Sequence, residues 1–282
     1  MRIIKSVSVM QKYILGLKSK NKRIGFVPTM GYLHKGHGAL LRRCRKENNI
    51  SVLSIFVNPK QFGPNEDFHR YPRDLKKDEL FAQREKVDII FYPSADDMYP
   101  KDYLTYVEVG KIAQGLCGKF RPGHFRGVAT VVGKLINVIQ PDILYLGQKD
   151  AQQAAILKRM IVDLNFPVRV KIVPTVREQD GLAMSSRNSY LNDKQRQQAP
   201  ILYRTLRHAE GLIQQGQRNP RKIIGQMRAM ILKAAPFKID YIECVDAASL
   251  DPLKVLRGDI LIALAAWLGK TRLIDNIVLT VK

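Results

Sequence analysis

The chain has 282 residues, of which 45% are hydrophobic and 26% charged, and its 47 Lys and Arg against 25 Asp and Glu give a net charge of +22. These proportions are those of an ordinary globular protein with one large or two modest domains, and no apolar run reaches the ~18 residues of a membrane span. The N-terminus lacks the apolar core of a signal peptide, and Cys44, Cys117 and Cys244 are too widely spaced for a zinc site, so we expect a cytoplasmic protein with reduced thiols.

The net charge of +22 has two interpretations. A strongly basic surface is typical of proteins that bind nucleic acids. Here the basic residues are scattered, and the sequence contains no block of pure Lys and Arg and no alternation of basic and aromatic residues. We therefore predict no nucleic-acid partner and no membrane partner, although the charge suits small anionic substrates.

Short apolar runs alternate with amphipathic segments through the first 175 residues. The runs are bounded by Pro, Gly or Asn and are typical of buried strands, whereas the amphipathic segments have the period of helices. The predicted strands are 3–4, 23–27, 51–57, 87–91, 143–146 and 168–173, and the predicted helices are 9–17, 37–48, 74–84, 128–139 and about 150–164. Loops are predicted at 63–73 and through much of 92–127.

Buried strands joined by helical crossovers form parallel sheets. We therefore predict an α/β fold in which five strand–helix alternations build a doubly wound, Rossmann-like sheet. After Pro174 the pattern changes to a polar loop, two helices and three strands, at 175–188, 193–215, 219–234, 239–245, 260–267 and 273–281. These segments predict a smaller α+β domain, so that the domains are 1–175 and 176–282.

The first core strand leads into a turn and a helix that carries His34 and His37 near its start. Unpaired backbone N–H groups and the positive end of the helix dipole favour anions at such a terminus. Gly36 has no Cβ and allows the backbone to approach a ligand. Two imidazoles at the same place can donate hydrogen bonds to a phosphate that gains charge during a reaction. We therefore predict that this turn binds a phosphate group.

Polar segments also follow two later strands. Asn58 and Gln61 come after the strand at 51–57, and Gly147 to Asp150 come after the strand at 143–146. Ligands of open α/β sheets bind beyond the carboxyl ends of the strands, which favours a binding role for both segments. By itself, a Gln on a loop usually faces solvent, and a helix N-cap explains Asp150 equally well.

Several segments together resemble the pantoate–β-alanine ligase family of the nucleotidylyltransferase superfamily. They are Val-Pro-Thr-Met-Gly-Tyr-Leu-His-Lys-Gly-His at 27–37, Phe-Val-Asn-Pro-Lys-Gln-Phe at 56–62, Arg-Pro-Gly-His-Phe-Arg-Gly at 121–127, Gly-Gln-Lys-Asp-Ala-Gln-Gln at 147–153, Asp-Gly-Leu-Ala-Met-Ser-Ser-Arg-Asn at 180–188 and Arg-Leu-Ile-Asp-Asn at 272–276. They run in the family's order along nearly the whole chain, so chance is a poor explanation. Lys60, Gln148 and Ala151 depart from the family pattern, and the effect of these departures is open.

The resemblance implies an enzyme that ligates (R)-pantoate and β-alanine to pantothenate, with ATP as a substrate. We expect Mg²⁺ as well, because ATP chemistry usually requires it. Pantoate is expected to form pantoyl adenylate and release pyrophosphate, after which β-alanine displaces AMP. His37, His34, Lys149 and Arg187 are the implied catalytic residues, and His37 is expected to donate a hydrogen bond or a proton toward the pyrophosphate. The resemblance also implies a homodimer and a C-terminal domain that closes over the active site.

The substrate-binding residues follow from the same motifs. Gln61 and Gln153 are the implied readers of pantoate, with Gln61 also near β-alanine, because an amide side chain both donates and accepts hydrogen bonds. The implied ATP-binding residues are Met30, Gly31, His34, Gly36, His37, Asn58, Gly147, Gln148, Lys149, Asp150, Val176, Met184, Ser185, Ser186 and Arg187. Arg121 and His124 fit a place near the substrate entrance, and a purely structural role for them is also open. The sequence identifies no Mg²⁺ ligand.

Two other functions stay open at this point. One is a nucleotidylyltransferase that acts on a phosphate ester and shares the histidine turn, and it predicts Arg or Lys in place of Gln61 and Gln153. The other is an RNA-binding, synthetase-like protein, which the charge of +22 favours. The second lacks support from any anticodon-type domain or basic–aromatic tract.

Overall fold

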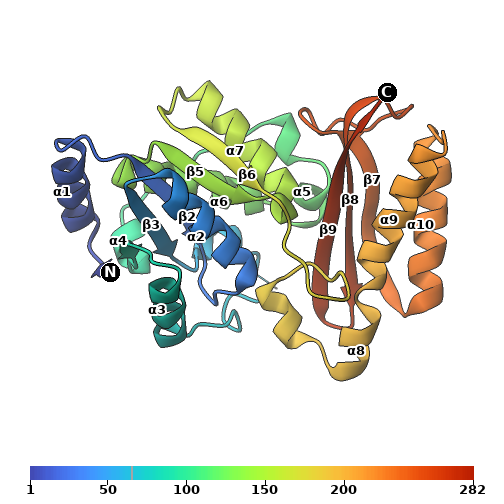
Figure 1. The fold of residues 1–282 in the computed structure, drawn as a ribbon, viewed down its shortest axis with the longest axis horizontal. Coiled ribbons are helices and arrows are strands. Elements are labelled where there is room, and N and C mark those ends of the chain that lie inside the picture. The colour runs from blue at the N-terminus through green and yellow to red at the C-terminus, as the bar shows by residue number, and fades with distance from the viewer. Residues whose placement is uncertain (65) are drawn as a thin grey trace. The chain divides into compact units, whose positions relative to one another are not determined.

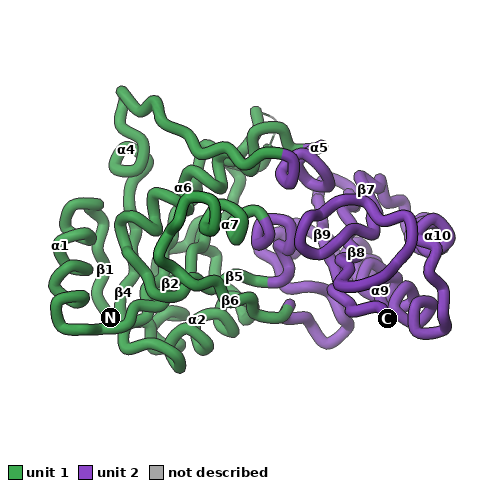
Figure 2. Tube along the Cα trace, turned by 90° about the horizontal axis from the view of Figure 1, so that it is seen from above, with its two compact units in different colours: residues 1–110, 121–147, 156–174 green, residues 111–120, 148–155, 175–282 purple. Residues whose placement is uncertain are grey.

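The computed structural model describes residues 1–64 and 66–282, and these divide into two compact units. Unit 1 comprises 1–110, 121–147 and 156–174, and unit 2 comprises 111–120, 148–155 and 175–282 (Figure 2). Asn65, which falls inside the loop predicted at 63–73, lies outside the described residues. Two short segments that precede residue 175, 111–120 and 148–155, thus belong to the unit that contains the C-terminus. The functional domains 1–175 and 176–282 stay a prediction.

Unit 1 is built on a six-stranded parallel sheet in the order β1-β4-β3-β2-β5-β6, of which Figure 1 labels β2, β3, β5 and β6. Its strands are β1 (Arg2–Ile4), β2 (Ile24–Thr29), β3 (Ile50–Ile55), β4 (Ile89–Phe91), β5 (Ile143–Gly147) and β6 (Arg169–Val173). Strand order runs outward from β2 to β4 in one direction and from β5 to β6 in the other, so the predicted doubly wound topology is confirmed. The carboxyl ends of β2 and β5 flank the point where the order reverses. The short β1 adds a sixth strand at the edge, beside β4.

Helices cover both faces of this sheet. The helices of unit 1 are α1 (Val7–Lys18), α2 (Lys35–Glu47), α3 (Leu75–Arg84), α4 (Ala95–Met98), α6 (His124–Ile139) and most of α7 (Ala151–Asp163), together with the 3₁₀ turn η1 (Pro59–Gln61). Buried Leu41 of α2 and Ala82 of α3 pack with Val27, Leu53 and Tyr145 of the strands. The helix α6 lies on the opposite side of the sheet (Figure 2). The inner strands β2, β3, β4 and β5 are therefore largely buried, which explains why they are apolar runs, whereas the edge strands β1 and β6 are more exposed.

Two helix predictions differ from the structure by more than two residues. The helix predicted from residue 128 begins at His124, because Gly123, with φ of +78°, turns the chain directly into the helix before the periodic apolar pattern starts. The helix predicted at 193–215 is two helices, α8 (Asp193–Gln198) and α9 (Ile201–Gln214). Pro200 lies between them and has no N–H with which to continue α8.

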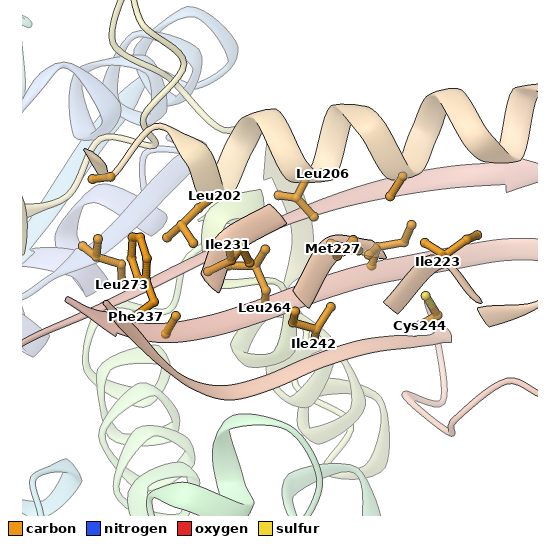
Figure 3. Close-up of a cluster of buried hydrophobic side chains, with 14 of the residues drawn as sticks. Leu202, Leu206, Ile223, Met227, Ile231, Phe237, Ile242, Cys244, Leu264 and Leu273 are labelled. Atoms are coloured by element: carbon orange, nitrogen blue, oxygen red, sulfur yellow. The ribbon is translucent and has the colours of Figure 1, made fainter. Parts of the chain in front are cut away.

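Unit 2 contains the predicted α+β arrangement. Its antiparallel strands are β7 (Phe237–Asp246), β8 (Gly258–Leu268) and β9 (Thr271–Val281), and its other elements are η2 (Lys111–Ala113), α5 (Cys117–Phe120), η3 (Gln148–Asp150), η4 (Ser186–Tyr190), α8, α9 and α10 (Pro220–Ala234). Side chains of α9 and α10 meet those of the strands in one apolar cluster (Figure 3), which includes Leu202, Leu206, Ile223, Met227, Ile231, Phe237, Ile242, Cys244, Leu264 and Leu273. None of the helices in the described part of the chain has the length and apolar character needed to cross a bilayer.

Candidate active site

The turn after β2 carries two histidines into the first turn of α2. His34 is the N-cap of α2, and its Nδ1 accepts a hydrogen bond from the Gly36 N–H at 3.1 Å. His37 Nδ1 accepts from the His34 N–H at 3.3 Å, and the two ring centroids lie 4.1 Å apart. Because both Nδ1 atoms accept from backbone N–H groups, this network assigns the proton of each neutral ring to Nε2. Each ring can therefore donate a hydrogen bond from its outer nitrogen.

A buried carboxylate on α3 holds the same turn. Asp78 accepts hydrogen bonds from the Tyr32 N–H at 2.8 Å and the Leu33 N–H at 2.6 Å. Gly31 has φ of +84°, and a Cβ there would lie 2.8 Å from Asp78 Oδ2, so only glycine fits without movement. Burial raises the pKa of Asp78, and the two backbone N–H groups oppose that rise. Sequence reasoning missed Asp78, because one acidic residue in an amphipathic helix gives no sign that it is buried.

The loop after β3 is organised by the side chain of Asn58, which is 1% exposed. Its Nδ2 donates to Gln61 Oε1 at 3.0 Å and to the Gly127 carbonyl at 3.1 Å. Its Oδ1 accepts from the Lys60 N–H at 3.2 Å and from the Tyr99 hydroxyl at 2.8 Å. The amide is thus fully hydrogen-bonded within unit 1. A phosphate contact by Asn58 would require it to exchange one of these bonds.

Gln61 is only 8% exposed, so its amide is not a solvent-facing group. Its Nε2 lies 3.2 Å from Met30 Sδ, while its Oε1 accepts the Asn58 bond. The second hydrogen on Nε2 has no partner in residues 1–64 and 66–282 that the hydrogen-bond geometry supports. Gln61 therefore combines a fixed orientation with donor capacity for a ligand.

Arg121 and His124 support the backbone of Gln61. His124 Nδ1 donates to the Gln61 carbonyl at 2.8 Å, and Arg121 Nη2 donates to the same oxygen at 3.4 Å. Arg121 Nη1 lies 3.0 Å from His124 Nε2, and Arg121 Nε donates to Glu66 Oε1 at 2.8 Å. Burial is the largest single effect on the pKa of Glu66 and acts to raise it, but the hydrogen bonds and charge of Arg121, with smaller effects of His124 and the Gly63 backbone, together hold that pKa below its usual value. The placement of Arg121 and His124 near a substrate entrance stays a prediction.

In unit 2, a backbone hydrogen bond fixes the start of the segment that contains Ser185 and Arg187. The Met184 N–H donates to the Val176 carbonyl at 3.0 Å, which closes a hairpin. Ser185 is the N-cap of η4, and its Oγ accepts from the Arg187 N–H at 3.3 Å. This geometry sets the backbone from which the Ser186 and Arg187 side chains extend.

A buried ion pair anchors that hairpin. Arg177 donates from Nη1 to Asp275 Oδ2 at 2.7 Å and from Nη2 to Asp275 Oδ1 at 3.0 Å. Its guanidinium carbon also lies 3.7 Å from the centroid of the Tyr203 ring. Asp275 is 3% exposed, so burial raises its pKa and Arg177 opposes the rise. Such a two-bond pair fixes both distance and orientation.

Adjacent glutamines in the first turn of α7, which belongs to unit 2, have different surroundings. Gln152 is buried, and its amide accepts from the Cys117 N–H at 2.9 Å and donates to the Gly115 carbonyl at 2.8 Å. Gln153 is half-buried, and its amide makes no hydrogen bond within the described ranges 1–64 and 66–282. Of the two, Gln153 has the capacity to bind a ligand.

The predicted site residues are divided between the two units of the chain. Unit 1 contains Met30, Gly31, His34, Gly36, His37, Asn58, Gln61 and Gly147, and unit 2 contains Gln148, Lys149, Asp150, Gln153, Val176, Met184, Ser185, Ser186 and Arg187. Lys149 Nζ lies 3.7 Å from Asp150 Oδ1. Among the residues that the structure describes, no group of three or more His, Cys, Asp or Glu is arranged to hold a metal ion.

The sequence and the fold both match one known family. A family model described as pantoate-beta-alanine ligase matches residues 2–278. The chain belongs to the pantoate–β-alanine ligase family. Pantothenate synthetase of Caldicellulosiruptor saccharolyticus is 53% identical over 281 residues, covering 100% of both chains. As a member of this family the chain is an enzyme, a ligase that joins pantoate and β-alanine with ATP as a substrate.

Solved structures of the family have the same fold. Pantothenate synthetase from Thermus thermophilus matches with a TM-score of 0.94 and 43% identity, covering 98% of this chain and 99% of that one. Pantoate–β-alanine ligase from Francisella tularensis, complexed with βγ-ATP and β-alanine, matches with a TM-score of 0.81 and 36% identity, covering 98% and 97%. The predicted fold, a parallel sheet domain with a smaller α+β part, is therefore confirmed.

Proposed function

We propose that the chain forms pantothenate in two steps through pantoyl adenylate. In the first step, a carboxylate oxygen of (R)-pantoate attacks the α-phosphorus of ATP, the bond from that phosphorus to the bridging oxygen breaks, and pyrophosphate leaves. In the second step, the amine of β-alanine attacks the acyl carbon, the bond to AMP breaks, and the nitrogen loses a proton as the amide forms. The Francisella relative, whose crystal structure is complexed with βγ-ATP and β-alanine, supports ATP and β-alanine as substrates.

The observation that carries this proposal is the start of α2. His34 and His37 use their Nδ1 atoms to cap the helix, so each ring carries its hydrogen on Nε2, the atom that can donate to a phosphate oxygen. The positive end of the helix dipole acts on the same place. We assign to His37 a hydrogen bond or proton toward the leaving pyrophosphate, and to His34 a hydrogen bond to the phosphates.

Two cations complete the catalytic set. A carboxylate and a polyphosphate repel each other, so the first step needs positive charge on the phosphate oxygens. Lys149 supplies a point charge and Arg187 a planar fork that fits two oxygens. The remaining proposed ATP-binding residues are Met30, Gly31, Gly36, Asn58, Gly147, Gln148, Asp150, Val176, Met184, Ser185 and Ser186.

Gln61 and Gln153 are the residues that we propose bind pantoate. Pantoate carries hydroxyl groups beside its carboxylate, and a carboxamide can donate to one oxygen and accept from another. The burial of Gln61 and the unused amide of Gln153 support this role. An enzyme for a phosphate ester would instead need cations at these positions, so the ester-specific nucleotidylyltransferase is the weaker alternative.

We also propose that Mg²⁺ enters with ATP. Mg²⁺ usually keeps several waters and binds through substrate phosphates with one or two carboxylates, which fits a protein whose described residues form no metal cluster. Bound there, it would neutralise phosphate charge. Asp150 is the one carboxylate among the proposed ATP-binding residues. We further propose that the enzyme is a homodimer, as its family resemblance implies. From the composition of the sequence we also propose that it is cytoplasmic and has no nucleic-acid partner.

Isotope exchange tests the adenylate. With ATP, Mg²⁺ and pantoate but no β-alanine, labelled pyrophosphate should enter ATP, because the first step is reversible. Steady AMP release should require β-alanine as well. Exchange that proceeds without pantoate, or AMP formation with unrelated acids at equal rate, would contradict the proposal.

Two substitutions separate the residue roles. His37→Ala should lower kcat by about 10²- to 10³-fold with little change in pantoate affinity, whereas His208→Ala, at a histidine on α9 that bonds Gln226, serves as the control. Gln153→Ala should chiefly raise the KM for pantoate, with the exposed Gln83 of α3 as its matched control. An unchanged kcat in the first variant, or a change confined to ATP affinity in the second, would show the assignments to be wrong.

A further inference from the structure

Two adjacent residues on β9, Asp275 and Asn276, hold segments that lie far away in the sequence. Side chains alternate along a strand, so the two point to opposite faces of the sheet. Asp275 shares a face with Leu273, which belongs to the helix-packed cluster, and binds Arg177 there. Asn276 points to the other face, where its partner is the turn η3.

The side chain of Asn276 is fully committed to η3. Its Nδ2 donates to the Gln148 carbonyl at 3.0 Å and to the Lys149 carbonyl at 2.8 Å, while its Oδ1 accepts from Gln148 Nε2 at 3.0 Å. Asn276 is 4% exposed, so water does not replace these bonds. A carboxylate of the same shape has no donors for the two carbonyls, and an apolar side chain leaves both without a partner.

These bonds determine where the side chain of Lys149 begins. A lysine carries its charge at the end of a flexible side chain. The position of its ammonium group therefore depends on where its backbone is held and on the atoms that pack around the side chain. The Lys149 side chain is 21% exposed, and its Nζ lies 3.7 Å from Asp150 Oδ1. Lys149 also lies close enough to Asp275 to act on that carboxylate electrostatically. The strand β9 thus holds the backbone of this residue through Asn276.

We propose that Asn276 is a positioning residue for catalysis, which fixes η3 so that the Lys149 ammonium meets the phosphates during adenylate formation. This inference rests on the proposed function, in which Lys149 stabilises charge on the phosphoryl group. Asn276 itself touches no substrate. Its effect on the rate passes through Lys149.

A double-mutant cycle tests this route. Lys149→Ala should lower the rate of pantoate-dependent pyrophosphate exchange by about 10²- to 10³-fold. Asn276→Leu and the isosteric Asn276→Asp should each lower it by about 10- to 10²-fold, as expected for a catalytic group displaced by about 1 Å. When either Asn276 substitution is added to Lys149→Ala, the rate should fall by less than about threefold further, because the ammonium group that Asn276 positions has already been removed.

A control substitution on the same strand shows whether any loss of rate comes only from a disturbed β9. Thr280 Oγ1 donates to Asp259 Oδ1 at 2.7 Å on the exposed part of β9, and Thr280→Val should leave the exchange rate unchanged. Normal exchange in both Asn276 variants, or losses that multiply fully in the double variants, would overturn the inference alone. A normal rate in Lys149→Ala would overturn the inference together with the proposed role of Lys149.

If one of the two Asn276 variants fails to fold, the exchange rate of the other tests the inference.

Discussion

Adding a single methyl group to α6 tests whether the backbone beneath Gln61 sets the affinity for pantoate. A Cβ on Gly127 would lie 2.2 Å from the Lys60 carbonyl oxygen and 2.7 Å from Gln61 Cα. Nonbonded heavy atoms settle at about 3.5 Å, so η1 has to move by roughly 1 Å. The movement would also disturb the bond from Asn58 Nδ2 to the Gly127 carbonyl.

The size of the effect follows from these contacts. Overpacking of this kind costs about 1–3 kcal/mol of unfolding free energy. A displacement of about 1 Å at a substrate-positioning residue lowers kcat/KM by about 10²-fold. We therefore expect Gly127→Ala to lower kcat/KM for pantoate by about 10- to 10²-fold and to change the KM for ATP far less.

Steady-state kinetics with each substrate varied in turn, together with thermal unfolding, measure both effects. Gly133→Ala is the matched control on the same helix, because its Cβ would meet nothing closer than 3.9 Å. Alanine in a helix is favoured over glycine by about 1 kcal/mol, so this variant should be as stable as the parent or more stable, with normal kinetics. A normal KM for pantoate in Gly127→Ala, or equal losses in both variants, would refute the reasoning.

Three further predictions concern the supports of the site. Asp78→Asn keeps the shape but loses one of two hydrogen bonds to the histidine turn, so it should cost about 2 kcal/mol in urea unfolding and lower kcat; a fully active, stable variant would count against this. Hydrogen bonds, first from Lys171, lower the pKa of Glu47 from 4.5 to about 2, so the stability that they provide is present above pH 4.5 and is lost as the pH falls toward 2. The urea midpoint of Glu47→Gln should therefore fall less over that pH range than the midpoint of the parent. Equal falls of the two midpoints with pH would exclude the effect. Arg177→Lys keeps the charge but loses the two-bond contact with Asp275, so the KM for ATP should rise by about tenfold, and an unchanged KM would separate the hairpin from ATP binding.

The sequence predicted most elements because their signals are local. Each buried strand of unit 1 is an apolar run bounded by a turn residue, and each long helix shows its own period. The start of α2 was predicted to within two residues, since Gly36 and the histidines mark it. The start of α6 and the break at Pro200 were missed, because the apolar period covers neither the first turn of α6 nor the interruption between α8 and α9.

The supports of the site could not be predicted in the same way. Asp78 is 45 residues from Leu33, and Asn276 is 128 residues from Gln148, so neither contact leaves a pattern in a short window. The burial of Gln61 was equally hidden. A glutamine after a strand usually faces solvent, and only α6 and Asn58 bring protein atoms around this one.

By itself, the order of residues determined which segments are strands and helices, where the histidine pair lies, and which family the chain resembles. Periodicity, turn residues and motif spacing are properties of neighbours along the chain, and they exist before the chain folds. The tertiary structure alone decided which nitrogen of each histidine carries the proton, which glutamine amides stay available, and which acidic and amide groups hold the loops. Those properties depend on hydrogen-bond partners brought together from distant parts of the sequence, and only packing selects them.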